Sequence, residues 1–256
     1  MHDLYMGIDV GTESARAGIF DAEGALLGSA ARGFPVYREP PVFVEQSAEA
    51  IWQAVSGACR EAIAESAVDP ARIRGIGFDA TCSLVVLDAE GKPLAVGPSE
   101  DPDRNIIVWM DHRAVAQAER INLTGHAVLD YVGGRSSPTM QNPKLLWLKE
   151  NRPAVFDRAA HFFDLTDYLS WRASGSTARS TCTVTCKWTY LAHERRWDAA
   201  YFHDIGLGEL ADEGFKRIGT EIVEPGTPLG DGLTDTAATD LGLSPGIAVG
   251  AGLIDA

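Results

Sequence analysis

A ten-residue stretch near the amino terminus, Gly7–Arg16, constrains the fold of this chain more than any other segment. It predicts an apolar strand, a tight turn and the beginning of a second strand. Asp9 lies at the end of the first strand, and Gly11 and Thr12 lie in the turn. A glycine there lets a phosphate group approach the backbone, while a carboxylate can hold Mg²⁺ through water. The alternative is a plain hairpin in which Asp9 only bonds to the turn.

We interpret this stretch as a phosphate-binding loop. Gly11, Thr12 and Ser14 would bind phosphate oxygens through backbone N–H groups and hydroxyls. Arg16 would add positive charge, and Asp9 would hold the metal ion. The chain contains neither a Walker-type loop nor the dinucleotide-binding glycine pattern, so the common nucleotide-binding folds are not indicated.

Strand and helix signals alternate along the first ninety residues. The apolar runs 15–20 and 25–34 predict two strands that continue the first one as an antiparallel meander. Ser47 is the expected N-cap of a helix, because apolar residues follow it at helical spacing as far as Ile63. The run 73–78 predicts a further strand.

From residue 113 onward the pattern is mostly helical, and the apolar run 247–254 predicts a late strand. Antiparallel strands, a crossover helix, further strands and inserted helices are typical of a mixed α/β domain. The last strand signal is followed by Asp255 and has no loop after it. We therefore expect the architecture to continue beyond residue 256.

Charge and composition exclude several classes of partner. The formal net charge is -14, so the chain lacks the basic excess that binds nucleic-acid phosphates or anionic membranes. We find no secretory signal and no apolar stretch of membrane-spanning length, and we expect a cytoplasmic protein. The 4 cysteines are too few for a disulfide scaffold, and their spacing does not complete a zinc site.

Several segments together resemble a known family. The Asp-x-Gly-Thr sequence at Asp9 is similar to the first phosphate loop of the actin-like ATPases. The segments 78–85, 109–114 and 252–256 resemble consecutive motifs of the FGGY carbohydrate kinases, in the same order. The string Thr-Cys-Ser-Leu-Val at 81–85 is similar to the branch that phosphorylates ribulose and related pentitols.

The resemblance implies an actin-like, ribonuclease H-like α/β domain with a mixed five-stranded sheet and helices on both faces. The helical stretch from about 113 to 243 would be an insertion that covers the sugar pocket. Residues 1–256 would form the N-terminal domain, which binds the sugar and carries the phosphate loop. Family members continue with a second domain that binds the nucleotide, which we expect here after residue 256.

The function that the resemblance implies is ATP-dependent transfer of a phosphoryl group to a hydroxyl of a small sugar or polyol, with ribulose or ribitol favoured. ATP and Mg²⁺ are the expected cofactors, and a homodimer is left open. Two alternatives remain at this point. One is a non-catalytic actin-like module that binds sugar or nucleotide, and the other is an acyl-phosphate kinase on the same scaffold.

Asp255 is the residue that the resemblance identifies as catalytic. A carboxylate within hydrogen-bond reach of a sugar hydroxyl can accept its proton as the oxygen attacks the γ-phosphoryl group. Without the resemblance, Asp255 is equally compatible with the cap of a following helix.

Trp109, Asp111 and Arg113 are candidates for sugar binding. Trp109 and Asp111 lie two residues apart and would present a ring face and a carboxylate from the same side of a strand. The alternative is a core tryptophan, with Asp111 as the N-cap of the helix that follows.

Three more candidates lie in two other segments. Thr81 and Cys82 follow a strand and would line a sugar pocket, although the pattern equally suits a turn with a buried thiol. The segment 182–188 is similar to one in ribulokinases whose lysine contacts the ketose, which identifies Lys187. The alternative is a solvated lysine, because most lysines are exposed.

Overall fold

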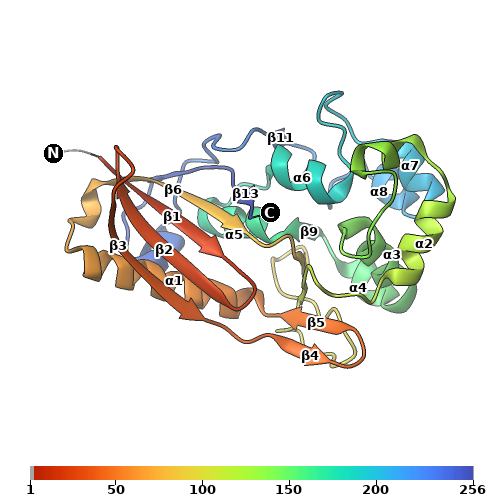
Figure 1. Cartoon of the computed structure of the whole chain (residues 1–256), viewed down its shortest axis with the longest axis horizontal. Coiled ribbons are helices and arrows are strands. Elements are labelled where there is room, and N and C mark those ends of the chain that lie inside the picture. The colour runs from red at the N-terminus through yellow and green to blue at the C-terminus, as the bar shows by residue number, and fades with distance from the viewer. Residues whose placement is uncertain (1–2, 256) are drawn as a thin grey trace.

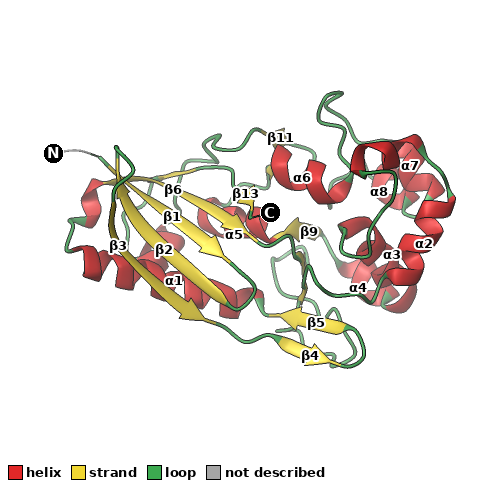
Figure 2. Ribbon diagram, in the orientation of Figure 1, coloured by secondary structure: helices red, strands yellow, loops and turns green. Residues whose placement is uncertain are grey.

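The computed structural model describes residues 3–255 and shows an elongated molecule with a sheet-rich end and a helix-rich end (Figure 1, Figure 2). Its larger sheet has the strand order β12-β6-β1-β2-β3, with β13 also paired to β6. The first three strands form an antiparallel meander, β6 is parallel to β1, and β12 and β13 are parallel to β6. The strands of this sheet are β1 (Leu4–Val10), β2 (Ser14–Asp21), β3 (Leu26–Gly33), β6 (Ile73–Ala80), β12 (Ala248–Val249) and β13 (Leu253–Ile254).

One face of the larger sheet forms the main hydrophobic core. Alternate residues of β1, from Leu4 to Val10, are buried, and the residues between them face the other side. This is the burial that a two-residue period predicts for a sheet covered on one face. Three helices join the same apolar cluster and cover this face: α1 (Ala48–Ser66), α5 (Leu165–Ser174) and α9 (Asp235–Leu241).

The fifth position of the sheet is filled by two short strands instead of one. β12 pairs with residues 75–76 of β6, and β13 pairs with residues 79–80. Between them the ladder is interrupted, although Gly250 N still donates a 3.0 Å hydrogen bond to the Ile76 carbonyl. The single strand predicted over 247–254 is therefore corrected to two strands that share one edge of β6.

The chain also forms a second sheet, to which β4 and β5 contribute before α1, and β7, β8 and β9 contribute after β6. It has the order β4-β5-β8-β7-β9 with antiparallel pairs, and its surrounding helices belong to a second apolar cluster. No helix within residues 3–255 is long and apolar enough to cross a lipid bilayer. The remaining elements are β4 (Tyr37–Glu39), β5 (Phe43–Gln46), β7 (Leu84–Leu87), β8 (Ile106–Ile107), β9 (His161–Asp164), β10 (Arg179–Ser180), β11 (Ile222–Val223), α2 (Val115–Leu123), α3 (Gln141–Asn151), α4 (Pro153–Arg158), α6 (Thr181–Trp188), α7 (Ala199–Asp204) and α8 (Gly208–Asp212).

The strands and the helix predicted within the first ninety residues occur in the predicted order, and two short strands that were not predicted, β4 and β5, lie between β3 and α1. Ser47 caps α1 as expected, since its Oγ accepts a 3.1 Å hydrogen bond from Ala50 N. The predicted insertion is smaller than the whole stretch 113–243, because α5 and α9 lie within that stretch and pack under the larger sheet. The second sheet was not predicted as a sheet, since strands of two to four residues carry little periodicity.

Gly252 offers a test of how β13 is seated. A Cβ at this position would lie 2.3 Å from Thr166 Cγ2 and 2.5 Å from the Phe78 carbonyl oxygen. We expect Gly252→Ala to lower the free energy of unfolding by about 1–3 kcal/mol, as overpacking does elsewhere. Gly77→Ala, where a Cβ meets nothing within 4 Å, is the matched control in urea denaturation. Equal stability of the two variants would contradict the tight seating of β13.

Candidate active site

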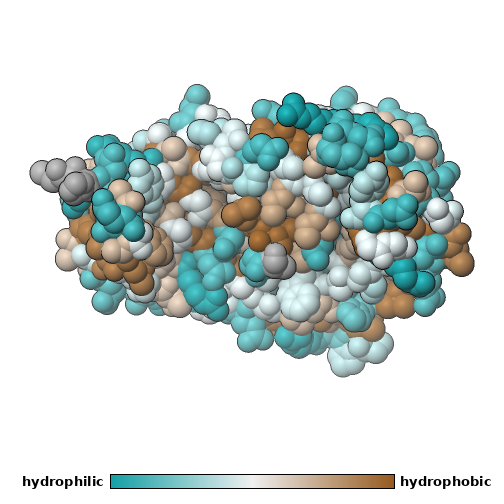
Figure 3. Space-filling view, turned by 45° about the horizontal axis from the view of Figure 1, so that its top comes forward, coloured by the Kyte–Doolittle hydropathy of each residue, from teal (hydrophilic) through white to brown (hydrophobic). Residues whose placement is uncertain are grey.

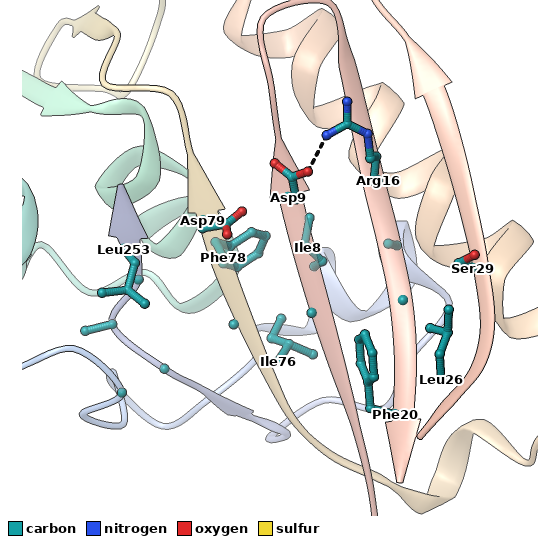
Figure 4. Close-up of a pocket in the computed structure, with 18 residues that line it drawn as sticks. Ile8, Asp9, Arg16, Phe20, Leu26, Ser29, Ile76, Phe78, Asp79 and Leu253 are labelled. Carbon is teal, nitrogen blue, oxygen red and sulfur yellow. Dashed lines mark hydrogen bonds and ion pairs between the residues drawn. The ribbon is translucent and has the colours of Figure 1, made fainter. Parts of the chain in front are cut away.

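The second face of the larger sheet borders a hollow of about 650 Å³ (Figure 4). Small residues form much of its floor, including Gly7, Gly18 and Gly77 from three adjacent strands. Asp9 and Asp79 lie on neighbouring strands at one end of it. We expected helices on both faces of this sheet. In the structure, α1, α5 and α9 cover the first face, whereas this hollow lies on the second. Apolar surface gathers near the middle of the side shown in Figure 3.

The predicted phosphate loop is a tight turn between β1 and β2. Gly11 N donates a 3.0 Å hydrogen bond to the Ser14 carbonyl, which closes the turn. Gln46 Nε2 donates to the Thr12 carbonyl at 2.6 Å, and Trp109 Nε1 donates to the Thr12 hydroxyl at 3.1 Å. Because side chains from two other segments hold it, the loop has a fixed shape before any ligand binds.

The packing inside the protein does not explain the glycine at position 11. The φ angle of Gly11 lies outside the left-handed region that favours glycine. A Cβ there would meet the Ser14 carbonyl oxygen at 3.7 Å and Arg16 at 3.8 Å, which are ordinary contact distances. A residue without a side chain leaves room on the open side of the loop, which fits the close approach of a phosphate group.

Asp9 and Arg16 form an ion pair across this hairpin (Figure 4). Their side chains are 39% and 58% exposed, and ion pairs in water contribute little to stability. Both groups can therefore leave this contact at small cost. Arg16 can turn to a phosphate oxygen, and Asp9 can turn to a hydrated cation.

Three carboxylates converge at this end of the sheet. Asp9 and Asp79 are register partners on β1 and β6, and Asp255 directly follows β13, which pairs with the end of β6. Burial, followed by the charges of Asp9 and Asp255, raises the pKa of Asp79 to about 6. Burial and then the charge of Asp9 raise the pKa of Asp255. Asp9, the metal candidate, and Asp255, the catalytic candidate, thus lie within electrostatic range of each other, as the kinase hypothesis requires.

Sequence reasoning did not single out Asp79. Its Oδ1 atom is buried and has no hydrogen-bond partner among the described residues. The signal that identifies it is positional. β1 and β6 are parallel neighbours that each carry an aspartate near the carboxyl end, the edge where ligands commonly bind in α/β sheets.

The arrangement fits a hydrated Mg²⁺ better than a directly chelated ion. Within residues 3–255, no three His, Cys, Asp or Glu side chains lie close enough to hold a metal ion among themselves. Mg²⁺ commonly keeps several waters and binds one or two carboxylates together with substrate phosphates. Asp9 is exposed enough to serve in this way, and a cation beside it would offset the repulsion among the three carboxylates.

Thr81, Cys82 and Lys187 gather near Asp255. Thr81 N donates a 3.0 Å hydrogen bond to the Val10 carbonyl, which ties the turn after β6 to the end of β1. Lys187, on α6, interacts electrostatically with both Cys82 and Asp255. The structure therefore brings these predicted residues together from three distant segments, and their contact with a sugar stays a prediction.

Trp109 connects the phosphate loop to these sugar-binding candidates. Its backbone N donates to Ser83 Oγ at 3.2 Å, and its indole Nε1 donates to the Thr12 hydroxyl. The side chain is nevertheless 38% exposed. A large ring that is held in place and still exposed is suited to stack on the C–H face of a sugar.

Asp111 and Arg113 lie elsewhere, in a buried ion cluster. Arg113 Nη2 donates to Asp111 Oδ2 and to Glu45 Oε1, each at 2.8 Å, and all three side chains are at most 2% exposed. The rings of Phe43 and Trp147 flank the guanidinium at 4.7 and 4.9 Å. The structure does not bring these two candidates to the open cleft, because Glu45, far away in sequence, holds them in the interior.

Asp164, fully buried at the end of β9, gives the protein a pH-dependent stability. Burial, together with the charge of Asp167, raises its pKa to about 8. Above pH ~4 the unfolded chain releases a proton that the folded protein keeps. The free energy of unfolding should therefore fall between pH ~4 and ~8, by up to about 1.4 kcal/mol per pH unit from this group.

Replacing Asp164 by Asn should flatten this dependence. Urea denaturation of both proteins at about pH 5 and about pH 7.5 measures the two slopes. Parallel slopes for the variant and the original protein would show that Asp164 does not keep its proton in the folded state.

Known proteins are similar to this chain along nearly all of its length. Residues 4–256 match the FGGY family of carbohydrate kinases, N-terminal domain. An FGGY carbohydrate kinase domain-containing protein of Homo sapiens is 52% identical over 255 residues, which cover 98% of this chain and 45% of that protein. A D-ribulokinase of Saccharomyces cerevisiae is 43% identical over 267 residues, which cover 99% of this chain and 37% of that protein.

Solved structures share the fold. A xylulose kinase from Rhodospirillum rubrum has a TM-score of 0.84 at 20% identity, over 98% of this chain and 49% of that one. A gluconate kinase from Lactobacillus acidophilus has a TM-score of 0.83 at 20% identity, over 100% of this chain and 48% of that one. These likenesses confirm the actin-like fold, and this chain spans about half the length of the relatives it matches. The chain belongs to the FGGY family of carbohydrate kinases, whose N-terminal domain it matches.

Proposed function

We propose that this chain is the sugar-binding and phosphate-binding half of a kinase that transfers a phosphoryl group from ATP to a hydroxyl of a small ketose or polyol, with ribulose or ribitol favoured. The observation that carries the proposal is the convergence of Asp9 and Asp255 at one end of an open sheet face. The preference for ribulose rests on the 43% identity to a D-ribulokinase.

The chemistry assigns separate tasks to the residues of the site. Asp255 accepts the proton of the sugar hydroxyl as its oxygen attacks the γ-phosphorus of ATP. The bond between the γ-phosphorus and the β-phosphate oxygen breaks, and ADP leaves. Lys187, whose charge acts on Asp255, helps to keep that carboxyl ionised. Thr12 and Ser14 bind phosphate oxygens at the turn, and Arg16 neutralises their charge. Mg²⁺, when bound beside Asp9, supplies charge neutralisation for the phosphates.

We further propose that a nucleotide-binding domain follows residue 256. The relatives of this chain are about twice as long, and the hollow beside the phosphate loop is open. A second domain that closes over this face would exclude water and limit ATP hydrolysis.

Two measurements test the proposal. The product of the complete reading frame should release ADP from ATP–Mg²⁺ in the presence of D-ribulose or ribitol, with weaker activity on gluconate or glycerol. Calorimetric titration of the 256-residue chain should show binding of the preferred sugar. Sugar binding without turnover by the complete product would favour the non-catalytic module instead, and absence of both would overturn the proposal.

A further inference from the structure

The first turn of α3 is polar and yet completely buried. Gln141, Asn142 and Lys144 each have 0% of their surface exposed. Burying an amide or an ammonium group is unfavourable unless the group makes hydrogen bonds. The partners of these three side chains therefore indicate what the turn does.

Two of the three side chains hold the backbone beside a sugar-binding candidate. Gln141 Nε2 donates a 3.1 Å hydrogen bond to the carbonyl of Cys82. Lys144 Nζ donates a 3.1 Å hydrogen bond to the carbonyl of Val108, the residue before Trp109. Cys82 lies in the loop between β6 and β7, and Val108 directly follows the short strand β8.

The third side chain holds the end of α6. Asn142 Nδ2 donates to the carbonyl of Trp188 at 3.3 Å and to the hydroxyl of Thr189 at 2.9 Å. Trp188 directly follows Lys187, and Thr189 is the C-cap of the helix. This contact therefore fixes the segment that carries Lys187.

We propose that the buried turn formed by residues 141–144 is a positioning unit for the sugar pocket. Cys82, Trp109 and Lys187 come from three chain segments, and the turn holds a carbonyl at or next to each of them. The turn does not touch the sugar itself. It sets the spacing of the groups that do, and errors of about 1 Å in such spacing weaken binding and catalysis strongly.

Gln141 also anchors the unit to the second sheet. Its Nε2 donates to Asp164 Oδ2 at 3.1 Å, and Asp164 pairs with Leu84 across β9 and β7. The turn is thus tied to the end of α6 through Asn142 and to the second sheet through Gln141. Rigid elements of this kind position a binding site more accurately than free loops.

The inference rests on the proposed sugar-binding function, and it can be tested with three variants of similar volume. Gln141→Met, Asn142→Leu and Lys144→Met each remove one donor. Each should weaken D-ribulose binding by about 10-fold, because the released carbonyl lets a sugar-contacting group move out of position. Each should also change the ratio of the affinities for D-ribulose and D-xylulose, because the spacing of the contacts distinguishes epimers. Isothermal titration calorimetry measures both quantities.

Leu148→Ala is the matched control. Leu148 is a fully buried apolar residue of the same helix, so its loss destabilises the protein without removing a donor. This variant should keep the sugar affinity and the epimer ratio. The three donor variants are independent, so one that does not fold leaves two that decide the question.

The outcomes separate the two claims. If the original chain binds no ketose or polyol, the proposed function fails, and the positioning role fails with it. If the original chain binds D-ribulose and the folded donor variants keep its affinity and epimer ratio, the positioning role alone is overturned.

Discussion

Replacing Asp255 by Asn in the product of the complete reading frame, the proposed kinase, is expected to lower kcat by roughly 10²–10⁴-fold, the usual contribution of a general base. An amide cannot accept the proton of the attacking hydroxyl. Sugar affinity should be retained, because asparagine keeps the size and polarity of the side chain. Steady-state ADP release and calorimetric sugar titration measure the two effects separately.

Asp235→Asn is the control for this experiment. Asp235 is an exposed aspartate in the first turn of α9, so its replacement should leave kcat unchanged. Turnover by the Asp255→Asn enzyme at the original rate would refute the assignment of Asp255 as the base.

Replacing Arg113 by Met should destabilise the fold by about 3–5 kcal/mol, because it leaves two buried carboxylates without their cation. Arg113 donates to Asp111 and Glu45 at 2.8 Å, in a site with almost no exposure. Burial already raises the pKa of Glu45 in spite of the neighbouring guanidinium. Urea denaturation measures the loss, which should far exceed any effect on sugar affinity.

Arg120→Met provides the comparison. Arg120 pairs with Glu150 at the surface, with side chains 51% and 39% exposed, and such pairs are worth about 1 kcal/mol or less. A folded Arg113→Met protein with normal stability and weakened sugar binding would instead place Arg113 in the sugar site.

The parts of the fold that the sequence predicts are those with strong local signals. The meander of β1, β2 and β3 follows from runs of apolar residues separated by turns, and α1 follows from helical spacing after Ser47. The phosphate loop is recognisable for the same reason, since its residues are adjacent in the chain.

The parts that the sequence does not predict depend on distant partners. β7 pairs with β9, where Leu84 meets Asp164, and neither strand is long enough to show a clear period. Arg113 looks like a cleft residue until Glu45, far earlier in the chain, is seen to hold it in the interior. The donors of the 141–144 turn are likewise explained only by carbonyls from three other segments.

The two short strands β12 and β13 also cover the outer edge of β6. β6 is eight residues long with buried apolar side chains, and β12 and β13 pair with its outer edge through residues 248–249 and 253–254. A shortened version that ends before residue 248 would leave the hydrogen-bonding groups of that edge unpaired. Bare apolar edges of this kind recruit strands from other molecules and lead to aggregation. A soluble form of this domain therefore needs its final eight described residues, quite apart from the carboxylate they carry.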